Sequence, residues 1–229
     1  MNKLSRTKLE LFLDCPRCFW LDVNKGVKRP GFPPYTINSA IDALLKDEFD
    51  AVRQSGMLHP VLKKNNIDAS PYKSDLLSEW RNNFVGIQFK HAPTDFLVFG
   101  AIDDIWVNKQ DELIVVDFKA TGAKEHQVYD SYKRQMDVYC WLFIQNGFKV
   151  SKTGYFLFAR VNKGGGFEGG RLAFDLFLVP QETNPGWVEN ALLACRKTLS
   201  GAMPEARDGC AYCQYISASL SKSNDKQLA

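Results

Sequence analysis

Two acidic residues and a lysine lie in apolar segments, where charged side chains are unfavourable. Asp117 and Lys119 end the apolar run that begins at Leu113, and Asp103 lies in the apolar segment before it. Burying a charge without a partner costs free energy, so each of these residues needs a structural or chemical role. Side chains alternate along a strand, so Asp117 and Lys119 share one face and Phe118 points to the other. Carboxylates gathered on paired strands are suited to hold a hard divalent cation.

The turn between the two segments decides whether the two carboxylates meet. If Lys109–Asp111 form a three-residue loop, Asn108 pairs with Glu112 and Asp103 falls directly opposite Asp117. Directly opposed Cβ atoms lie roughly 4.5–5.5 Å apart, which lets two carboxylates share one metal ion. A slip of one residue would turn Asp103 to the other face of the sheet. The register of this hairpin therefore decides the candidate active site.

The elements that must position these residues follow from the hydrophobic pattern. A helix that Ser5 can cap runs into a first pair of cysteines, and a glycine-rich segment at 163–170 is expected to join two strands of a hairpin. That segment lacks the lysine and helix start of a phosphate-binding loop. Further helices are expected at about 38–53, 74–82, 131–146 and 187–199, and strands at about 96–107, 112–119, 155–161 and 171–179. This order predicts an α/β fold with a mixed central sheet flanked by helices.

Four of the six cysteines form two C-x-x-C pairs at opposite ends of the chain: Cys15, Cys18, Cys210 and Cys213. Cys140 and Cys195 lie in apolar helical patterns and are expected to be buried. In a reducing compartment such pairs indicate metal or redox chemistry more than disulfides. A thioredoxin-like role for the first pair lacks the preceding βαβ context. We therefore expect a four-cysteine metal site.

The composition sets broad limits on function. The 229 residues are 45% hydrophobic and carry a net charge of +3, which permits nucleic-acid binding without arguing for it. No apolar run reaches the roughly 18 residues of a membrane span, and the first residues lack the apolar stretch of a signal peptide. The sequence therefore predicts a cytoplasmic protein that does not associate with a membrane.

Three motifs together resemble the PD-(D/E)XK nuclease superfamily: Gly100-x-x-Asp103, Asp117-Phe118-Lys119 and Gln135-x-x-x-Tyr139. The last motif is typical of the RecB-like branch, and its two residues share a helix face because they lie one turn apart. The resemblance implies a restriction-endonuclease-like core at about 96–180 within one nuclease domain that spans 1–229. It also implies hydrolysis of phosphodiester bonds in DNA with Mg²⁺ or Mn²⁺.

The resemblance also assigns roles to these residues. Asp103, Asp117 and the Phe118 backbone carbonyl would hold the divalent cation, and Lys119 would orient or help to deprotonate the water. Two further catalytic residues, Gln135 and Tyr139, would contact the DNA backbone or steady the lysine. The alternatives are a cross-strand salt bridge for the charged set and a polar helix face for Gln135 and Tyr139.

One position departs from the RecB-like pattern, which carries a metal-binding histidine on an N-terminal helix. The three histidines of this chain lie in other contexts: His59, His91 and His126. Asp42 occupies the position that we align with that histidine and is a candidate metal ligand. The alternative for Asp42 is an i,i+4 ion pair with Lys46. Asp104 would point away from Asp103 and is expected to be solvated.

The cysteines resemble those of the iron–sulfur RecB-like nucleases, which are the AddB-type helicase–nucleases and the CRISPR-associated exonucleases. In that group one N-terminal and three C-terminal cysteines hold a [4Fe–4S] cluster, whereas this chain divides its four cysteines two and two. Four thiolates satisfy either a [4Fe–4S] cluster or Zn²⁺, and we favour the cluster. In both cases the metal would be structural and would join the segments 5–20 and 205–216, which we call the cysteine clasp.

The predicted function is metal-dependent, exonucleolytic cleavage of DNA in repair, recombination or defence. Candidate contacts to the phosphate backbone are Lys133, Arg134 and Arg160. A separate helicase or CRISPR integration protein is a candidate partner. Two alternatives come from other classes: an inactive nuclease fold that binds nucleic acid or a partner, and a redox-sensing iron–sulfur protein.

Overall fold

The computed structural model describes residues 2–31, 33, 35–125 and 127–225. Its α-helices are α1 (Arg6–Asp14), α2 (Pro16–Lys25), α3 (Thr36–Ser55), α4 (Pro60–Lys64), α5 (Leu77–Trp80), α6 (Asp130–Gln145), α7 (Val188–Ser200) and α8 (Ala211–Asp225). Its strands are β1 (Asn2–Ser5), β2 (Ala69–Pro71), β3 (Ile87–His91), β4 (Phe96–Gly100), β5 (Asp104–Asn108), β6 (Leu113–Thr121), β7 (Thr153–Val161) and β8 (Phe174–Glu182).

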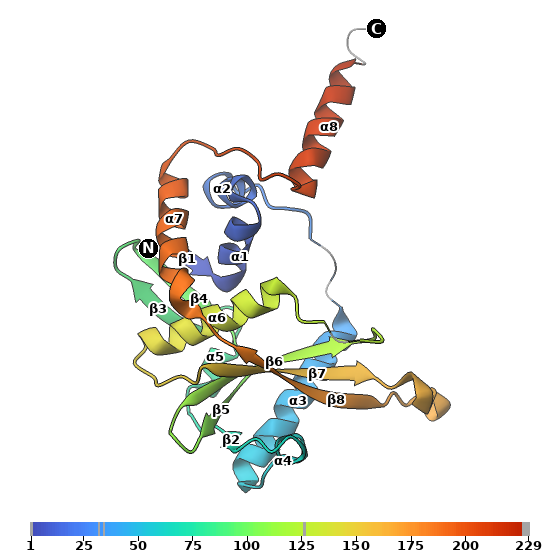
Figure 1. The fold of residues 1–229 in the computed structure, drawn as a ribbon. Coiled ribbons are helices and arrows are strands. Elements are labelled where there is room, and N and C mark those ends of the chain that lie inside the picture. The colour runs from blue at the N-terminus through green and yellow to red at the C-terminus, as the bar shows by residue number, and fades with distance from the viewer. Residues whose placement is uncertain (1, 32, 34, 126, 226–229) are drawn as a thin grey trace.

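A five-stranded mixed sheet in the order β2-β5-β6-β7-β8 lies at the centre of the fold (Figure 1). The pair β6 and β7 is parallel, and the other neighbouring pairs are antiparallel. Helices cover both faces of this sheet. Leu113 and Val115 of β6 pack in the core that includes α6, whereas Ile114 and Val116 pack in the core that includes α3. Because β6 is buried on both faces, its sequence is apolar without alternation. The predicted α/β architecture is confirmed.

A smaller sheet in the order β1-β4-β3 corrects the predicted strand at 96–107. That stretch forms two strands in different sheets, because the chain leaves β4 at Gly100 and enters β5 at Asp104. Strands β1 and β3 were not expected from the sequence. The helix expected at 74–82 is limited to the single turn α5, and the glycine-rich segment contains two short 3₁₀ turns.

Segments from the N- and C-terminal parts of the chain lie side by side, because α1 and α2 pack against α7 (Figure 1). Cys15 lies between α1 and α2, and Cys18 lies in α2. Cys210 directly precedes α8 and Cys213 lies in its first turn, and α8 then projects away from the body (Figure 1). The predicted cysteine clasp is therefore confirmed as a meeting of N- and C-terminal segments. None of the helices in the described part of the chain combines the length and apolar character that a membrane span needs.

Candidate active site

The β5–β6 hairpin has the register that the sequence predicts. Asp104 pairs with Val116, which sets Asp103 opposite Asp117 at the open end of the hairpin. The loop holds this register because Asp111 adopts a left-handed conformation with φ of 57°. Beside the loop, the Asn108 backbone N–H donates to the Glu112 carbonyl at 3.1 Å. The hairpin thus brings both predicted carboxylates to one place.

A polar cavity of about 330 Å³ lies over this end of the hairpin, between α3, β6 and α6. Its lining includes all the residues predicted to bind the divalent cation and all the predicted catalytic residues except Tyr139: Asp42, Asp103, Asp117, Phe118, Lys119 and Gln135. These residues come from separate parts of the chain, so tertiary folding alone brings them together. The cavity is the candidate active site.

Asp117 is the most unusual carboxylate in the cavity. Its side chain is 1% exposed, and neither of its oxygens has a hydrogen-bond partner of good geometry among the described residues. The Lys119 ammonium is nevertheless in ion-pair contact with Oδ2. Burial, reinforced by the charge of Asp103, raises the pKa of Asp117 to about 7, although Lys119 opposes this shift. A buried carboxylate whose one partner is the Lys119 ammonium, at Oδ2, fits a divalent cation, which would supply a partner for the other oxygen.

Asp103 and Phe118 fix the open end of the hairpin beside the cavity. The Phe118 backbone N–H donates to Asp103 Oδ2 at 2.8 Å, which fixes the carboxylate beside β6. The Phe118 ring turns to the opposite face, where it stacks on Phe49 of α3 with ring centroids 5.5 Å apart. The predicted alternation along β6 is therefore confirmed. It leaves Asp117 and Lys119 together on the α6 side of the strand.

Lys119 is held by a chain of contacts that leads into α6. Its ammonium donates to Gln135 Oε1 at 3.4 Å, and Gln135 Nε2 donates to the Tyr139 hydroxyl at 2.9 Å. The ammonium also lies 4.5 Å from the centre of the Tyr132 ring. Burial raises the pKa of Tyr139, so its hydroxyl remains protonated near neutral pH. Gln135 and Tyr139 thus form one buried hydrogen-bonded unit behind the lysine.

Gly100 of the first motif has a packing role. A Cβ atom added here would lie 2.7 Å from Tyr139 Cε1 and 3.1 Å from Cδ1. Real Cβ atoms do not approach a ring this closely, so the Tyr139 ring requires glycine at this position. The G-x-x-D motif and the Q-x-x-x-Y motif are therefore in direct contact.

Asp42 projects from α3 into the same cavity. Lys46, one turn later, donates to Asp42 Oδ2 at 2.6 Å and lies 3.3 Å from Asp103 Oδ1. Burial and the charge of Asp103 raise the pKa of Asp42, and Lys46 opposes this shift. Burial lowers the pKa of Lys46, but Asp103 and Asp42 outweigh it and keep the value above the ordinary one. The i,i+4 ion pair of Asp42 with Lys46 is confirmed, whereas a metal-binding role for Asp42 stays a prediction.

The two described histidines lie outside the cavity. His59 contacts Glu48 at 2.9 Å, and His91 contacts Thr94 and Glu189, each at 2.7 Å. His126 lies outside the described residues. Neither described histidine therefore takes the place that Asp42 occupies.

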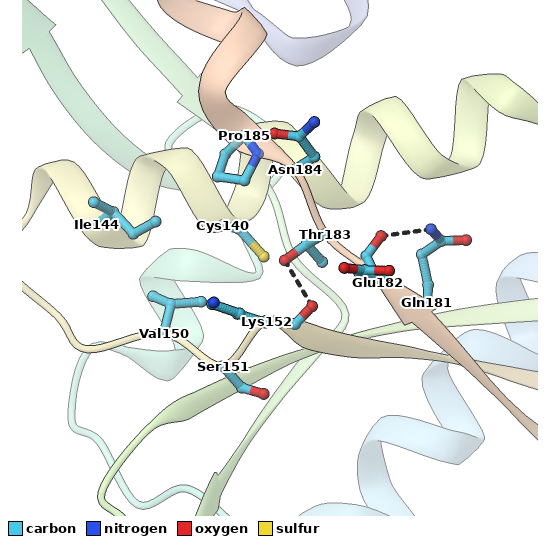
Figure 2. Close-up of a pocket in the computed structure, with 10 residues that line it drawn as sticks. All are labelled: Cys140, Ile144, Val150, Ser151, Lys152, Gln181, Glu182, Thr183, Asn184 and Pro185. Atoms are coloured by element: carbon cyan, nitrogen blue, oxygen red, sulfur yellow. Dashed lines mark hydrogen bonds between the residues drawn. The ribbon is translucent and has the colours of Figure 1, made fainter.

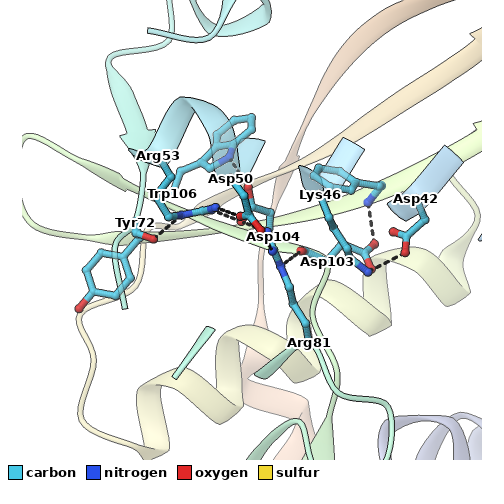
Figure 3. A network of polar contacts seen from close by, with 10 residues as sticks. Asp42, Lys46, Asp50, Arg53, Tyr72, Arg81, Asp103, Asp104 and Trp106 are labelled. Atoms are coloured by element: carbon cyan, nitrogen blue, oxygen red, sulfur yellow. Dashed lines mark hydrogen bonds and ion pairs between the residues drawn. The ribbon is translucent and has the colours of Figure 1, made fainter. Parts of the chain in front are cut away.

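A buried charge network beside the cavity corrects the prediction for Asp104. This residue is 0% exposed and pairs with Arg53 and Arg81, while Asp50 pairs with the same two arginines (Figure 3). Burial raises the pKa of Asp104, and the two arginines oppose the shift. Arg81 also donates to the Asp103 carbonyl at 2.8 Å, so the network holds the backbone of a candidate metal ligand. The rule that drew attention to Asp117, a charge in an apolar strand, applies equally to Asp104.

The three cations predicted to contact phosphate each have an acidic partner within the protein. Lys133 pairs with Asp130 at 3.0 Å, Arg134 pairs with Glu10 at 2.6 Å, and Arg160 lies 3.5 Å from Asp175. These pairs belong to the chain itself, and a contact to DNA stays a prediction for all three residues.

The four thiols of the cysteine clasp converge on one point. Cys18 Sγ lies 3.7 Å from Cys210 Sγ and 3.6 Å from Cys213 Sγ, and Cys15 Sγ lies 3.9 Å from Cys213 Sγ. All four sulfurs lie within 4.8 Å of one another. Burial opposes ionisation of Cys15, but hydrogen bonds from backbone groups lower its pKa to about 6. Four converging thiols, one of them readily ionised, fit a metal ion or cluster.

A larger cavity of about 750 Å³ lies between the C-terminal half of α6, the segment before β7, and the end of β8 with the loop that follows it (Figure 2). Among the described residues that line it, Glu182 is the one acidic side chain. Burial raises the pKa of Cys140 in its wall to about 12, so this thiol stays protonated at neutral pH. The cavity lacks the gathered carboxylates of the site between α3 and α6.

The fold and the cavity together define a mixed α/β protein with carboxylates and a lysine at the open end of a central hairpin. The sequence model of the PD-(D/E)XK nuclease superfamily matches residues 3–218. The chain therefore belongs to this superfamily of nucleases, which cleave phosphodiester bonds. No curated protein matches the sequence. A solved structure described as "Crystal structure of SSO0001" is 15% identical, covers 93% of this chain and 83% of its own, and has a TM-score of 0.45.

Proposed function

We propose that this protein is a RecB-like DNA nuclease that hydrolyses phosphodiester bonds with Mg²⁺ or Mn²⁺ and acts as an exonuclease. The observation that carries the proposal is the Asp117 carboxylate, which is buried, pairs through Oδ2 with Lys119, has no partner for Oδ1 among the described residues, and shares its cavity with Asp103 and Asp42. A protein that used these residues only for stability would satisfy the buried oxygens with hydrogen bonds. Membership of the nuclease superfamily supports the same conclusion. We assign the whole of 1–229 to one nuclease domain.

Each residue of the cavity would have a separate role in hydrolysis. Asp103, Asp117 and the Phe118 carbonyl would hold the cation, with Asp42 as a further ligand. The cation would polarise the phosphate and lower the pKa of a bound water. Lys119 would orient the attacking water and stabilise the negative charge that develops on the phosphate. Gln135 and Tyr139 would keep the lysine in place.

The cysteine clasp would hold a [4Fe–4S] cluster, with Zn²⁺ as the alternative, and would be structural. It joins an N-terminal and a C-terminal segment of the chain and is built from residues that do not line the carboxylate cavity. Iron and sulfide analysis, together with the visible absorbance of anaerobically purified protein, distinguishes the two metals. Zinc without visible absorbance would exclude both the cluster and the redox-sensing alternative.

The test of the nuclease proposal is cleavage of end-labelled single- and double-stranded DNA with Mg²⁺ or Mn²⁺. We expect metal-dependent degradation whose product ladder reports polarity, and we expect Lys119→Ala to abolish it. Lys109→Ala is the matched control, because Lys109 is an exposed lysine that pairs only with Asp68 among the described residues. DNA binding without cleavage in either metal would instead support the inactive binding module. A helicase or an integration protein that acts with the nuclease would be sought only after activity is established.

A further inference from the structure

Lys46 occupies the carboxylate cavity in a way that the catalytic assignment does not use. Its ammonium lies 2.6 Å from Asp42 Oδ2 and 3.3 Å from Asp103 Oδ1, so it bridges α3 and the hairpin (Figure 3). The other Asp103 oxygen accepts from the Phe118 N–H at 2.8 Å. Lys46 therefore sits where a cation would bridge Asp42 and Asp103.

The charge of Lys46 affects how many divalent cations the cavity can hold. In their ionised forms, which bind a cation, Asp42, Asp103 and Asp117 supply three negative charges, and Lys46 and Lys119 supply two positive ones. One divalent cation brings this set close to neutrality, whereas a second would leave a large positive excess in a partly buried site. Charges of the same sign about 4 Å apart repel each other strongly where water is scarce. Without Lys46 the set carries one positive charge less, so the positive excess that two divalent cations would leave is smaller, and the space between Asp42 and Asp103 is vacated.

The positions of Asp42 and Asp103 around the Lys46 ammonium also argue against a second cation. Two-metal sites need bridging carboxylates, with ions about 3.5–4 Å apart. Asp42 and Asp103 lie on either side of the Lys46 ammonium, which takes one oxygen from each. A second ion would need those oxygens, and it would have to displace an ammonium held by two carboxylates.

We propose that Lys46 acts as a built-in counter-ion that limits this site to one divalent cation. The proposal rests on the proposed function, because it assumes that the carboxylates bind a metal. Lys46 is thus a positioning residue that sets metal stoichiometry and holds Asp42 against Asp103. Its removal would open a second cation site between these two carboxylates.

Counting bound Mn²⁺ tests the proposal without reference to activity. The full chain is titrated with Mn²⁺, and the free ion is measured by electron paramagnetic resonance. We expect one bound ion in the wild type and two in Lys46→Met, which keeps the aliphatic stem and removes the charge. Lys46→Arg, which keeps the charge, and the exposed control Lys109→Met are expected to bind one ion. Mn²⁺ favours oxygen ligands over thiolates, and the cysteine clasp is unchanged in every variant.

The number of Mn²⁺ ions bound distinguishes the proposed role of Lys46 from the proposed nuclease metal site. Two ions in the wild type, or a single ion in Lys46→Met, would overturn the role of Lys46 and leave the proposed nuclease site intact. No bound Mn²⁺ in any variant would refute the proposed metal site itself, and the role of Lys46 with it. Circular dichroism verifies that each variant is folded, and Lys46→Gln replaces Lys46→Met if the latter does not fold.

Discussion

Asp117→Asn is expected to stabilise the metal-free protein at pH 8, although it removes a proposed metal ligand. The pKa of Asp117 rises from its ordinary 3.8 to about 7, chiefly through burial. The folded protein therefore binds this proton more tightly than the unfolded chain does. Stability is lost as pH rises from about 4 to about 7, and it stays low above that range. At about 1.4 kcal/mol for each pH unit, the ionised carboxylate costs about 4 kcal/mol.

Asp117→Asn recovers only part of the free energy that the ionised carboxylate costs. A buried asparagine amide without hydrogen bonds costs about 1–3 kcal/mol, so the net gain at pH 8 is about 2 kcal/mol. For a chain of this size, that gain raises Tm by roughly 4–8 °C. At pH 5 the wild-type carboxyl is already neutral, and the variant has no advantage.

The assay is thermal unfolding at pH 5 and pH 8 without added Mg²⁺ or Mn²⁺. Asp68→Asn is the control, because Asp68 is exposed and its ion pair with Lys109 lies at the surface. An Asp117→Asn variant that is less stable than wild type at pH 8, or whose Tm difference is equal at both pH values, would refute the reasoning. Added Mn²⁺ should then raise the Tm of the wild type and leave that of the variant unchanged.

Three further variants test neighbouring parts of the account. Gly100→Ala should reduce DNA cleavage by at least tenfold and lower Tm, because its methyl group meets the Tyr139 ring. The decrease in Tm should be smaller when Gly100→Ala is made in a Tyr139→Leu background. Equal decreases in the two backgrounds would contradict the contact between Gly100 and Tyr139. Cys210→Ser should release the clasp metal, measured by elemental analysis, whereas Cys195→Ser should retain it; equal metal contents would exclude the four-cysteine site. Asp104→Ala removes the buried carboxylate that Arg53 and Arg81 share and leaves Asp50 as their acidic partner, so it should lower the free energy of unfolding in urea by about 1.5–3 kcal/mol; a loss below about 1 kcal/mol would show that the network is not needed.

Local signals in the sequence were sufficient to predict the hairpin and the clasp. The register of β5 and β6 depends on a short loop whose residues are adjacent in sequence, so counting residues placed Asp103 opposite Asp117. The alternation along β6 likewise follows from strand geometry. The four cysteines could be grouped because two C-x-x-C pairs in one chain are typical of a shared metal site.

Features that depend on distant residues could not be predicted in the same way. Asp104 was expected to be solvated, yet its partners Arg53 and Arg81 lie 51 and 23 residues earlier in the chain. The bridge from Lys46 to Asp103 depends on how α3 packs against the hairpin, and no local pattern specifies that packing. The break of the expected strand at 96–107 has the same origin, because β4 pairs with β1 from the start of the chain.

The central claim is that Asp103 and Asp117 hold the catalytic divalent cation. Anomalous diffraction from crystals grown with Mn²⁺ tests it most directly, because the ion is located without reference to activity. The account predicts a peak between these two carboxylates, with oxygen ligands that include the Phe118 carbonyl at about 2.1 Å, roughly the distance seen for Mg²⁺. A peak elsewhere in the molecule, or none at saturating Mn²⁺, would contradict it.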